Sequence, residues 1–279
     1  MNDSVARIAR ASERRFGSAV AVPEGTSGLE VLAAMLEHRS QRRFTTRAVS
    51  DELLQLLFAC AMSAPSKSDL QQADIIQVRD AALRERIAAL LPDNPWVAAA
   101  PVLLVFCGNN RRTRQVAQWR GKTFANDHLD AFMNAAVDAG IVLMNFITAA
   151  EAVGLGCCPI SSIRNHAQTV SDLLELPEWV FPLAGMCVGY PESAGAITPR
   201  LPLDVTIHTD RFSDAGVEAK VDAYDRRRHA LLPYAKQRGV GRFGEAAFYG
   251  WSEDKARQYA RPQRAGFGEF IRRKRFGLD

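Results

Sequence analysis

The spacing of apolar and polar residues predicts a chain of helices that is interrupted by four short strands. Apolar residues three or four positions apart indicate helices, and short β-branched or apolar runs indicate buried strands. Ser50 is the expected N-cap of one helix. Helices are predicted near 29–38, 50–63, 81–91, 128–153, 165–174 and 217–229, and strands near 75–78, 102–107, 157–160 and 183–188. The pattern indicates an α+β or α/β chain with one core and a long C-terminal arm.

The segment 128–153 is apolar on nearly every side, which is typical of a helix buried on all faces or held between subunits. Its longest apolar run, 139–150, is too short to cross a bilayer, and residues 1–16 lack the apolar region of a secretory signal. We therefore expect a protein without a membrane partner.

The five cysteines are odd in number and contain no Cys-x-x-Cys pair within 279 residues. We expect such thiols in a chain of this size to be reduced, as in the cytoplasm, and mostly packed in the core. Cys157 and Cys158 are adjacent, so their side chains point apart in a strand.

Charge is distributed unevenly along the chain. Residues 226–279 carry 14 Lys and Arg against 5 Asp and Glu, whereas the rest carries 21 against 26. A basic segment of this kind fits nucleic acid, an acidic membrane surface or an anionic small molecule.

Two arginine-containing segments are candidates for binding a phosphate. The run 38–42 places Arg39 and Arg42 three positions apart, so a continuing helix would put both guanidiniums on one face. A solvated helix end with basic residues is the alternative interpretation. Arg200 lies between two prolines that fix its backbone, either as an anion contact or in a loop salt bridge.

Other motifs are absent or misleading. The Gly-x-Gly-x-x-Gly at 239–244 has no strand before it and is interpreted as a loop rather than a dinucleotide fingerprint. The sequence contains no phosphate-binding Walker loop, no metal-ligand cluster and no serine-hydrolase elbow. An enzyme with this sequence would need a cofactor to supply the reactivity.

Five blocks of sequence together resemble the FMN-dependent nitroreductase family, most closely its larger NADPH-preferring subgroup of oxygen-insensitive nitroreductases and flavin reductases. These blocks are 38–44, 63–71, 154–164, 185–191 and 199–202. The resemblance implies a nitroreductase-like α+β fold, with a central mixed or antiparallel sheet flanked by helices. It also implies an intertwined homodimer with FMN at the interface.

The resemblance assigns contacts but no catalytic side chain, because the chemistry takes place on the flavin N5. The FMN contacts it implies are His38, Arg39, Ser40, Arg42, Pro65, Ser66, Ser68, Gln71, Pro159, Ile160, Ser161, Ser162 and Arg200. The NADPH or substrate contacts it implies are Asp69, Arg238, Arg242, Arg261 and Arg264.

The implied activity is an NAD(P)H oxidoreductase that reduces nitroaromatics or quinones in two steps through FMN. Flavin reduction and reductive dehalogenation are alternatives on the same fold. A nucleic-acid-binding protein is a remoter one, with phenylalanines of the basic tail as a stacking platform. We expect an N-terminal extension at 1–27, an FMN-binding core at 28–205, and a basic arm at 206–279 over the substrate and NADPH pocket.

Four residues depart from the pattern of the subgroup. Ser161 and Ser162 stand where related sequences often have two glycines, and Thr198 where they often have Lys. Asp69 adds a carboxylate expected near the flavin, where it would repel anionic substrates. These departures leave FMN binding expected and the substrate class open.

Overall fold

The computed structural model describes residues 3–279, which group into two compact units. The first unit joins the described part of Met1–Arg39 to Ala196–Gln263, and the second joins Ser40–Gly195 to Arg264–Asp279. The grouping therefore differs from the linear division at residues 27 and 205. Helices from both ends of the chain form one unit, and the last sixteen residues return to the other.

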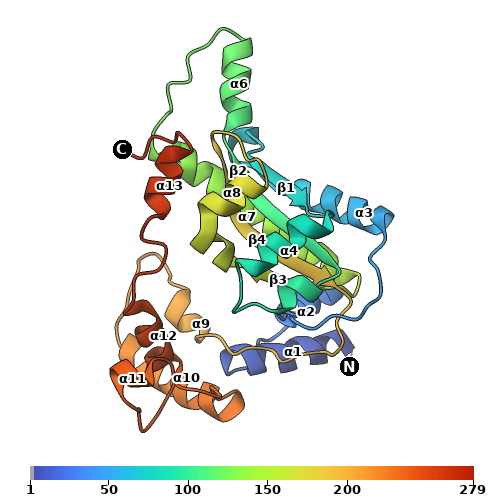
Figure 1. The fold of residues 1–279 in the computed structure, drawn as a ribbon. Helices are drawn as coiled ribbons and strands as arrows, with labels where there is room; N and C mark the ends of the chain where they lie inside the picture. Colours follow the sequence, from blue (N-terminus) through green and yellow to red (C-terminus); the bar gives the residue numbers. More distant parts are fainter. Residues whose placement is uncertain (1–2) are drawn as a thin grey trace. The chain divides into compact units, whose positions relative to one another are not determined.

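The second unit is built on a four-stranded antiparallel sheet, β1-β2-β4-β3 (Figure 1). Its strands are β1 (Ala73–Gln77), β2 (Val102–Asn109), β3 (Gly156–Ile160) and β4 (Val180–Gly189). Val105 in β2 lies opposite Ile76 on one side and Gly185 on the other, and Gly185 lies opposite Ile160. All four predicted strands are present, and the predicted α+β class is confirmed.

Helices cover both faces of this sheet because the central strand β2 is apolar at successive positions. Leu104 and Phe106 pack with α3 (Asp51–Met62) and α7 (Leu129–Ala152). Leu103 and Val105 point the other way, toward α4 (Ala81–Ala89), α5 (Trp96–Ala99) and α8 (Ala167–Leu173). Every residue of β2 is buried, so the sheet is the middle of three layers.

Local capping fixes where the helices begin. The Ser50 hydroxyl accepts a hydrogen bond from the Leu53 N–H at 3.2 Å, which confirms the predicted N-cap of α3. The Asp80 carboxylate caps α4 in the same way, accepting from the Leu83 N–H at 2.7 Å. The remaining elements of the second unit are η1 (Lys67–Asp69), α6 (Arg111–Trp119), η2 (Ser161–His166) and α13 (Phe267–Arg273).

The long helix α7 is buried on one face only. Asp138, Ala139 and Phe146 lie inside the unit, whereas five apolar residues on the opposite face are between 37% and 55% exposed. We call this face the α7 stripe, and it consists of Leu129, Met133, Val137, Ile141 and Met144. With 24 residues, α7 is long and apolar enough to cross a membrane by length and composition, contrary to the expectation from 139–150 alone. Its packing against the sheet is that of a core helix.

The basic C-terminal helix α13 packs into the second unit. Phe270 and Phe276 are 2% and 3% exposed and lie in one cluster with Phe181 and Ala135. Aromatic rings buried in this way cannot stack on bases, so these two phenylalanines do not form the platform that a nucleic-acid-binding tail requires.

The first unit is helical throughout its regular elements. These are α1 (Asp3–Phe16), α2 (Leu29–Leu36), α9 (Leu203–Thr206), α10 (Val217–Leu231), α11 (Val240–Phe243) and α12 (Trp251–Tyr259). Arg7 of α1 forms ion pairs with Glu30 at 2.6 Å and Glu37 at 2.8 Å, and so ties α1 to α2.

The cysteine thiols are free, and all except Cys60 are buried. Burial raises the pKa of both Cys107 and Cys187 to about 12, so these thiols stay protonated at neutral pH and are poor nucleophiles. This arrangement agrees with the prediction that the thiols are mostly packed in the core, and Cys60 is the exception.

Candidate functional site

The segment expected to bind phosphate is extended, not helical. Helix α2 ends at Leu36, and Ser40 forms a parallel bridge with Cys157. The Gln41 N–H donates to the Cys157 carbonyl at 2.8 Å. The predicted helical face shared by Arg39 and Arg42 is therefore wrong, because pairing with the edge of β3 replaces the helical turn. The same pairing brings two of the expected blocks, 38–44 and 154–164, side by side.

Arg42 is exposed beside this edge strand. Its guanidinium carbon lies 5.4 Å from the ring centroid of Trp96, within the range of a cation–π contact. Burial raises the pKa of the neighbouring Cys158 thiol, while Arg42 and Trp96 act in the opposite direction. Arg42 thus places a positive charge next to β3, where an anionic group could bind.

Arg39 carries a buried donor without an acceptor. Its Nε atom has no hydrogen-bond partner among the described residues. Leaving a buried donor unpaired costs about 1–3 kcal/mol, and a phosphate oxygen is the acceptor that a guanidinium binds best. This orphaned donor in a half-buried side chain is what a site for a phosphorylated cofactor would contain. His38 is half-buried beside it, and Arg200 is exposed in the same unit.

The second expected block is a backbone loop of unusual conformation. Ser68, Asp69 and Gln71 have φ values of +51°, +58° and +52°, in the left-handed region. Such conformations cost on the order of 1–3 kcal/mol each and persist only where surrounding contacts impose them. The side chains of Pro65, Ser68, Asp69 and Gln71 are exposed, so the loop presents them to solvent.

The contact that imposes this loop comes from Asp138, a residue that the sequence reasoning missed. Asp138 is 2% exposed in the middle of α7. Its carboxylate accepts from the Ser66 hydroxyl at 2.6 Å, the Lys67 N–H at 3.1 Å and the Gln72 N–H at 3.2 Å. A lone carboxylate in the centre of an otherwise apolar helix was the available signal, because a buried charge needs several donors.

These bonds change the role of Ser66. Its hydroxyl donates to Asp138 and accepts from the Gln71 N–H at 2.7 Å. The single donor of the hydroxyl is used within the protein, so Ser66 can offer a ligand only an acceptor. Gln71 in turn donates its side-chain N–H to the Asp69 carboxylate at 3.1 Å, which fixes the orientation of both exposed side chains.

The third block offers mainly backbone. Ile160 is 3% exposed and points into the core, and the Ser162 hydroxyl donates to the Asn94 side chain at 2.6 Å. Pro159 and Ser161 are exposed, and proline is tolerated here because β3 is an edge strand. Peptide groups and the Ser161 hydroxyl are therefore what this segment can present to a ligand.

Sheet register relates this block to the loop before β1. The antiparallel pairing makes the start of β1 and the end of β3 leave the same end of the sheet, at its two opposite edges. Three inter-strand spacings separate the edges, or about 14 Å. The loop before β1 and the segment after β3 thus lie at the same end of the sheet. The two strands themselves are on opposite edges and do not contact each other.

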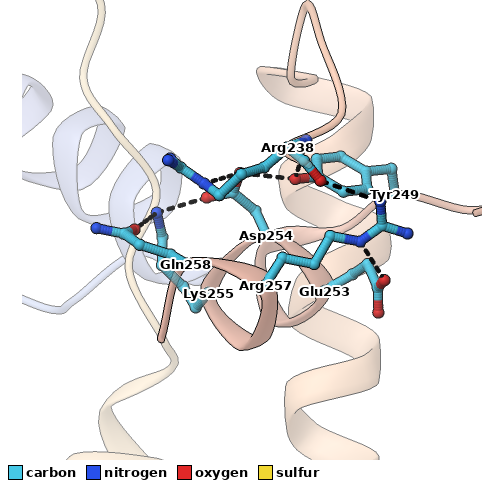
Figure 2. Close-up of polar contacts among 7 residues, drawn as sticks. All are labelled: Arg238, Tyr249, Glu253, Asp254, Lys255, Arg257 and Gln258. Atoms are coloured by element: carbon cyan, nitrogen blue, oxygen red, sulfur yellow. Dashed lines mark hydrogen bonds and ion pairs between the residues drawn. The ribbon is translucent and has the colours of Figure 1, made fainter. Parts of the chain in front are cut away.

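Arg238 lies in the polar cluster that Figure 2 shows around Asp254. Its Nε is 3.5 Å from the Asp254 carboxylate. The same carboxylate forms an ion pair with Lys255 at 2.6 Å and accepts a hydrogen bond from the Tyr249 hydroxyl at 2.8 Å. Burial acts to raise the pKa of Asp254, but Lys255 and Tyr249 outweigh it and hold that pKa below its usual value. Because Arg238 is 49% exposed and shares Asp254 with Lys255, part of its charge still faces solvent.

The glycine motif at 239–244 is a short turn that includes α11, and the element directly before it is the helix α10 rather than a strand, as expected from the sequence. Arg257 donates to the carbonyls of Arg238 at 3.1 Å and Gly244 at 2.9 Å, so one side chain holds both ends of the turn. Arg242 is exposed on it, with its guanidinium 5.1 Å from the Phe243 ring centroid. Arg261 is also exposed.

Arg264 lies elsewhere, in a cavity of about 270 Å³ formed by η2, α8 and α13. Its Nε donates to the Asn165 side chain at 3.0 Å. Arg164 and Arg273 also line this cavity, whereas none of the residues expected to bind FMN does.

Comparison with known proteins matches this arrangement to one family along nearly the whole chain. The model of the nitroreductase family matches residues 35–190, and the model of the nitroreductase family C-terminal domain matches residues 198–279. The chain belongs to the nitroreductase family. The family resemblance of the five blocks and the nitroreductase-like fold are thereby confirmed.

Individual relatives of this chain are of similar length. An FMN reductase [NAD(P)H] of Bacillus subtilis is 32% identical over 253 residues, which cover 90% of this chain and 99% of that protein. An oxygen-insensitive NADPH nitroreductase of Salmonella typhimurium is 35% identical over 202 residues, which cover 72% and 81%. The structure of Bacillus megaterium NfrA2 superimposes with a TM-score of 0.81 at 30% identity, covering 90% of this chain and 99% of that one.

Replacing Asp138 by Ala is expected to lower the free energy of unfolding by about 2–4 kcal/mol, because it removes a buried acceptor shared by three donors. Urea unfolding measures this change. Asp130→Ala, an exposed carboxylate on the same helix, is the matched control, with an expected cost below about 1 kcal/mol. Equal stabilities of the two variants would show that Asp138 does not hold the loop.

Proposed function

We propose that this chain is an FMN-dependent NAD(P)H oxidoreductase that reduces nitroaromatics or quinones in two successive steps. Family membership supports the chemistry, and relatives of this length are named as FMN reductases and NADPH nitroreductases. The observation that carries the cofactor assignment is the buried, unpartnered Nε of Arg39, which provides a ready donor for the FMN phosphate. When bound there, FMN would supply the hydride and electron transfer between the nicotinamide and the acceptor.

The residues of the chain supply position and charge. Arg39, Arg42 and Arg200 are proposed to balance the phosphate charge, and Ser40 and His38 to contribute hydrogen bonds to the phosphate. The Asp138-held loop from Pro65 to Gln71 and the peptide groups around Ile160 and Ser161 are proposed to contact the ring. Donors near the flavin N1 and O2 atoms would stabilise negative charge that develops there, as in an oxyanion hole. Thr198 carries no positive charge where related sequences often have Lys, so we propose that the three arginines alone would balance the phosphate.

Free flavin as the electron acceptor is the second candidate, favoured by the name of the Bacillus subtilis relative. Reductive dehalogenation stays an alternative on the same fold. Asp69 bears on the choice between acceptors, because its exposed carboxylate would disfavour anionic substrates.

NADPH is proposed to bind through the basic arm. Arg238 and Arg242 are offered for its 2′-phosphate, and Arg261 and Arg264 for the region over the substrate pocket. Arg238 is the strongest of these candidates, because the bonds of the Asp254 cluster fix its backbone while about half of its side chain stays exposed.

We further propose a cytoplasmic homodimer that engages neither nucleic acid nor membrane. The α7 stripe supports the dimer, because five large apolar side chains exposed along one helix face indicate a protein interface. Isologous pairing of two such stripes would bury them.

The deciding experiment is anaerobic stopped-flow absorbance of the FMN-loaded protein, which is expected to be yellow. Mixing with NADPH or NADH should bleach the flavin, and adding a nitroarene should restore its colour. Nicotinamide absorbance that continues to fall with an excess of free FMN but not with the nitroarene would favour the flavin reductase. A protein that takes up no FMN, or whose flavin neither nucleotide reduces, would contradict the proposal.

Arg238→Ala is expected to raise the KM for NADPH by about 10-fold or more while leaving the KM for NADH within about twofold, because only NADPH has a 2′-phosphate. Steady-state kinetics with both nucleotides measures this. Lys236→Ala, an exposed cation two residues away, is the control and should change neither value. Equal changes for NADPH and NADH would remove the assignment.

Met133→Asp in the α7 stripe is expected to convert the dimer to monomer, because a charge buried in an apolar interface is strongly unfavourable. Sedimentation velocity at micromolar concentration reports the change. Phe212→Asp, at a residue 78% exposed outside the stripe, should leave the dimer intact. A Met133→Asp protein that sediments like the parent would place the dimer interface elsewhere.

A further inference from the structure

Helix α1 precedes the part of the chain that the nitroreductase family shares. The family model begins at residue 35, and the match to the Bacillus subtilis relative covers 99% of that protein but only 90% of this chain. Nevertheless α1 is firmly built into the first unit. Ile8 and Ala11 are 4% and 2% exposed, and Arg7 forms ion pairs with both Glu30 and Glu37.

Arg15, in the last turn of α1, reaches two distant parts of the chain. It is 6% exposed. Its guanidinium donates to the Leu36 carbonyl at 2.9 and 3.0 Å, to the His38 carbonyl at 2.6 Å and to the Thr198 carbonyl at 3.2 Å. One side chain thereby ties the backbone immediately before Arg39 to the backbone just before Arg200.

The backbone of α1 also forms a hydrogen bond with the backbone of Arg200 itself. The Arg200 N–H donates to the Arg15 carbonyl at 2.7 Å. Arg227 of α10 donates to the Arg200 carbonyl at 2.9 Å and to the Arg15 carbonyl at 3.1 Å. Both peptide groups that flank the Arg200 side chain are therefore fixed by hydrogen bonds.

The residue between Thr198 and Arg200 is held as well. Tyr224 donates its hydroxyl to the Pro199 carbonyl at 3.1 Å. Three consecutive carbonyls, those of Thr198, Pro199 and Arg200, thus each accept a bond from a different side chain. These bonds fix the backbone that carries the exposed Arg200 side chain.

We propose that α1 is a clamp for the phosphate end of the flavin, with Arg15 as a positioning residue that holds Arg39 and Arg200 ready for the same anion. The proposal rests on the proposed function, since the anion is the FMN phosphate. The Arg15 guanidinium donates to backbone carbonyls and would act on the anion only through the two arginines that it positions. Fixing a binding group before the ligand arrives increases affinity, because less conformational freedom is lost on binding.

The test compares FMN with riboflavin, which lacks the phosphate, by flavin fluorescence titration of the full-length apoprotein. Arg15→Met keeps an aliphatic stem but removes the donors. It is expected to weaken FMN binding by about 10-fold or more while riboflavin binding stays within about twofold. Arg15→Lys should lie between this variant and the parent, because an ammonium cannot reproduce the guanidinium fork.

Two further variants calibrate the measurement. Arg10→Met, an exposed arginine on the same helix, should bind both flavins like the parent. Arg200→Ala removes a proposed phosphate ligand directly. It should weaken FMN binding and leave the affinity for riboflavin unchanged. If Arg15→Met fails to fold, Arg227→Met takes its place, since it removes the bond to the Arg200 carbonyl from the other side.

The outcomes separate the clamp from the proposed function. FMN binding that falls in Arg200→Ala but not in Arg15→Met or Arg227→Met would overturn the clamp and leave the oxidoreductase intact. An equal loss of FMN and riboflavin in the Arg15 variants would mean general destabilisation and would overturn it too. A parent protein that binds neither flavin would remove the proposed function, and the clamp with it.

Discussion

Burial of β2 on both faces is the constraint on which the second unit depends. A strand that is covered on two sides needs apolar residues at every position, and Val102 to Cys107 provide them. The two layers of helices follow from this, because Leu104 and Phe106 need one cover and Leu103 and Val105 need another. Polar side chains that could bind a ligand are therefore confined to the ends of the strands and to the loops, where the candidate FMN contacts lie.

Buried polar groups then fix those loops. The Asp138 carboxylate is enclosed by α7 and the loop before β1, so its negative charge is stabilised only by donors that the loop provides. To place these donors, the loop holds three residues in the left-handed backbone region. Arg15 is the counterpart in the first unit, a buried cation whose donors gather carbonyl groups. In both units a single charged side chain orders the backbone that carries the proposed ligands.

The proposed division of labour suits a flavoenzyme. The reactive group belongs to the cofactor, so the protein needs fixed backbone and well-placed charge rather than an acid–base pair. The buried thiols agree with this view, because burial keeps Cys107 and Cys187 protonated and out of the chemistry. The exposed Asp69 and Gln71 side chains, which bond to each other, are where acceptor preference would be set.

The sequence by itself determined the four strands, the long helices, the class and the family, but it did not show the shorter helices such as α6 and α12. The pattern of apolar residues located β2, α3 and α7, because burial leaves a pattern among neighbouring residues. Ser50 marked the start of a helix because its hydroxyl bonds to a residue only three positions away. It misjudged the segment at Arg39, because pairing with β3 depends on a partner more than a hundred residues away. Only the tertiary structure decided the roles of Asp138 and Arg15. Their bonds join residues far apart in sequence, and a single Asp or Arg carries no local pattern that names its partners.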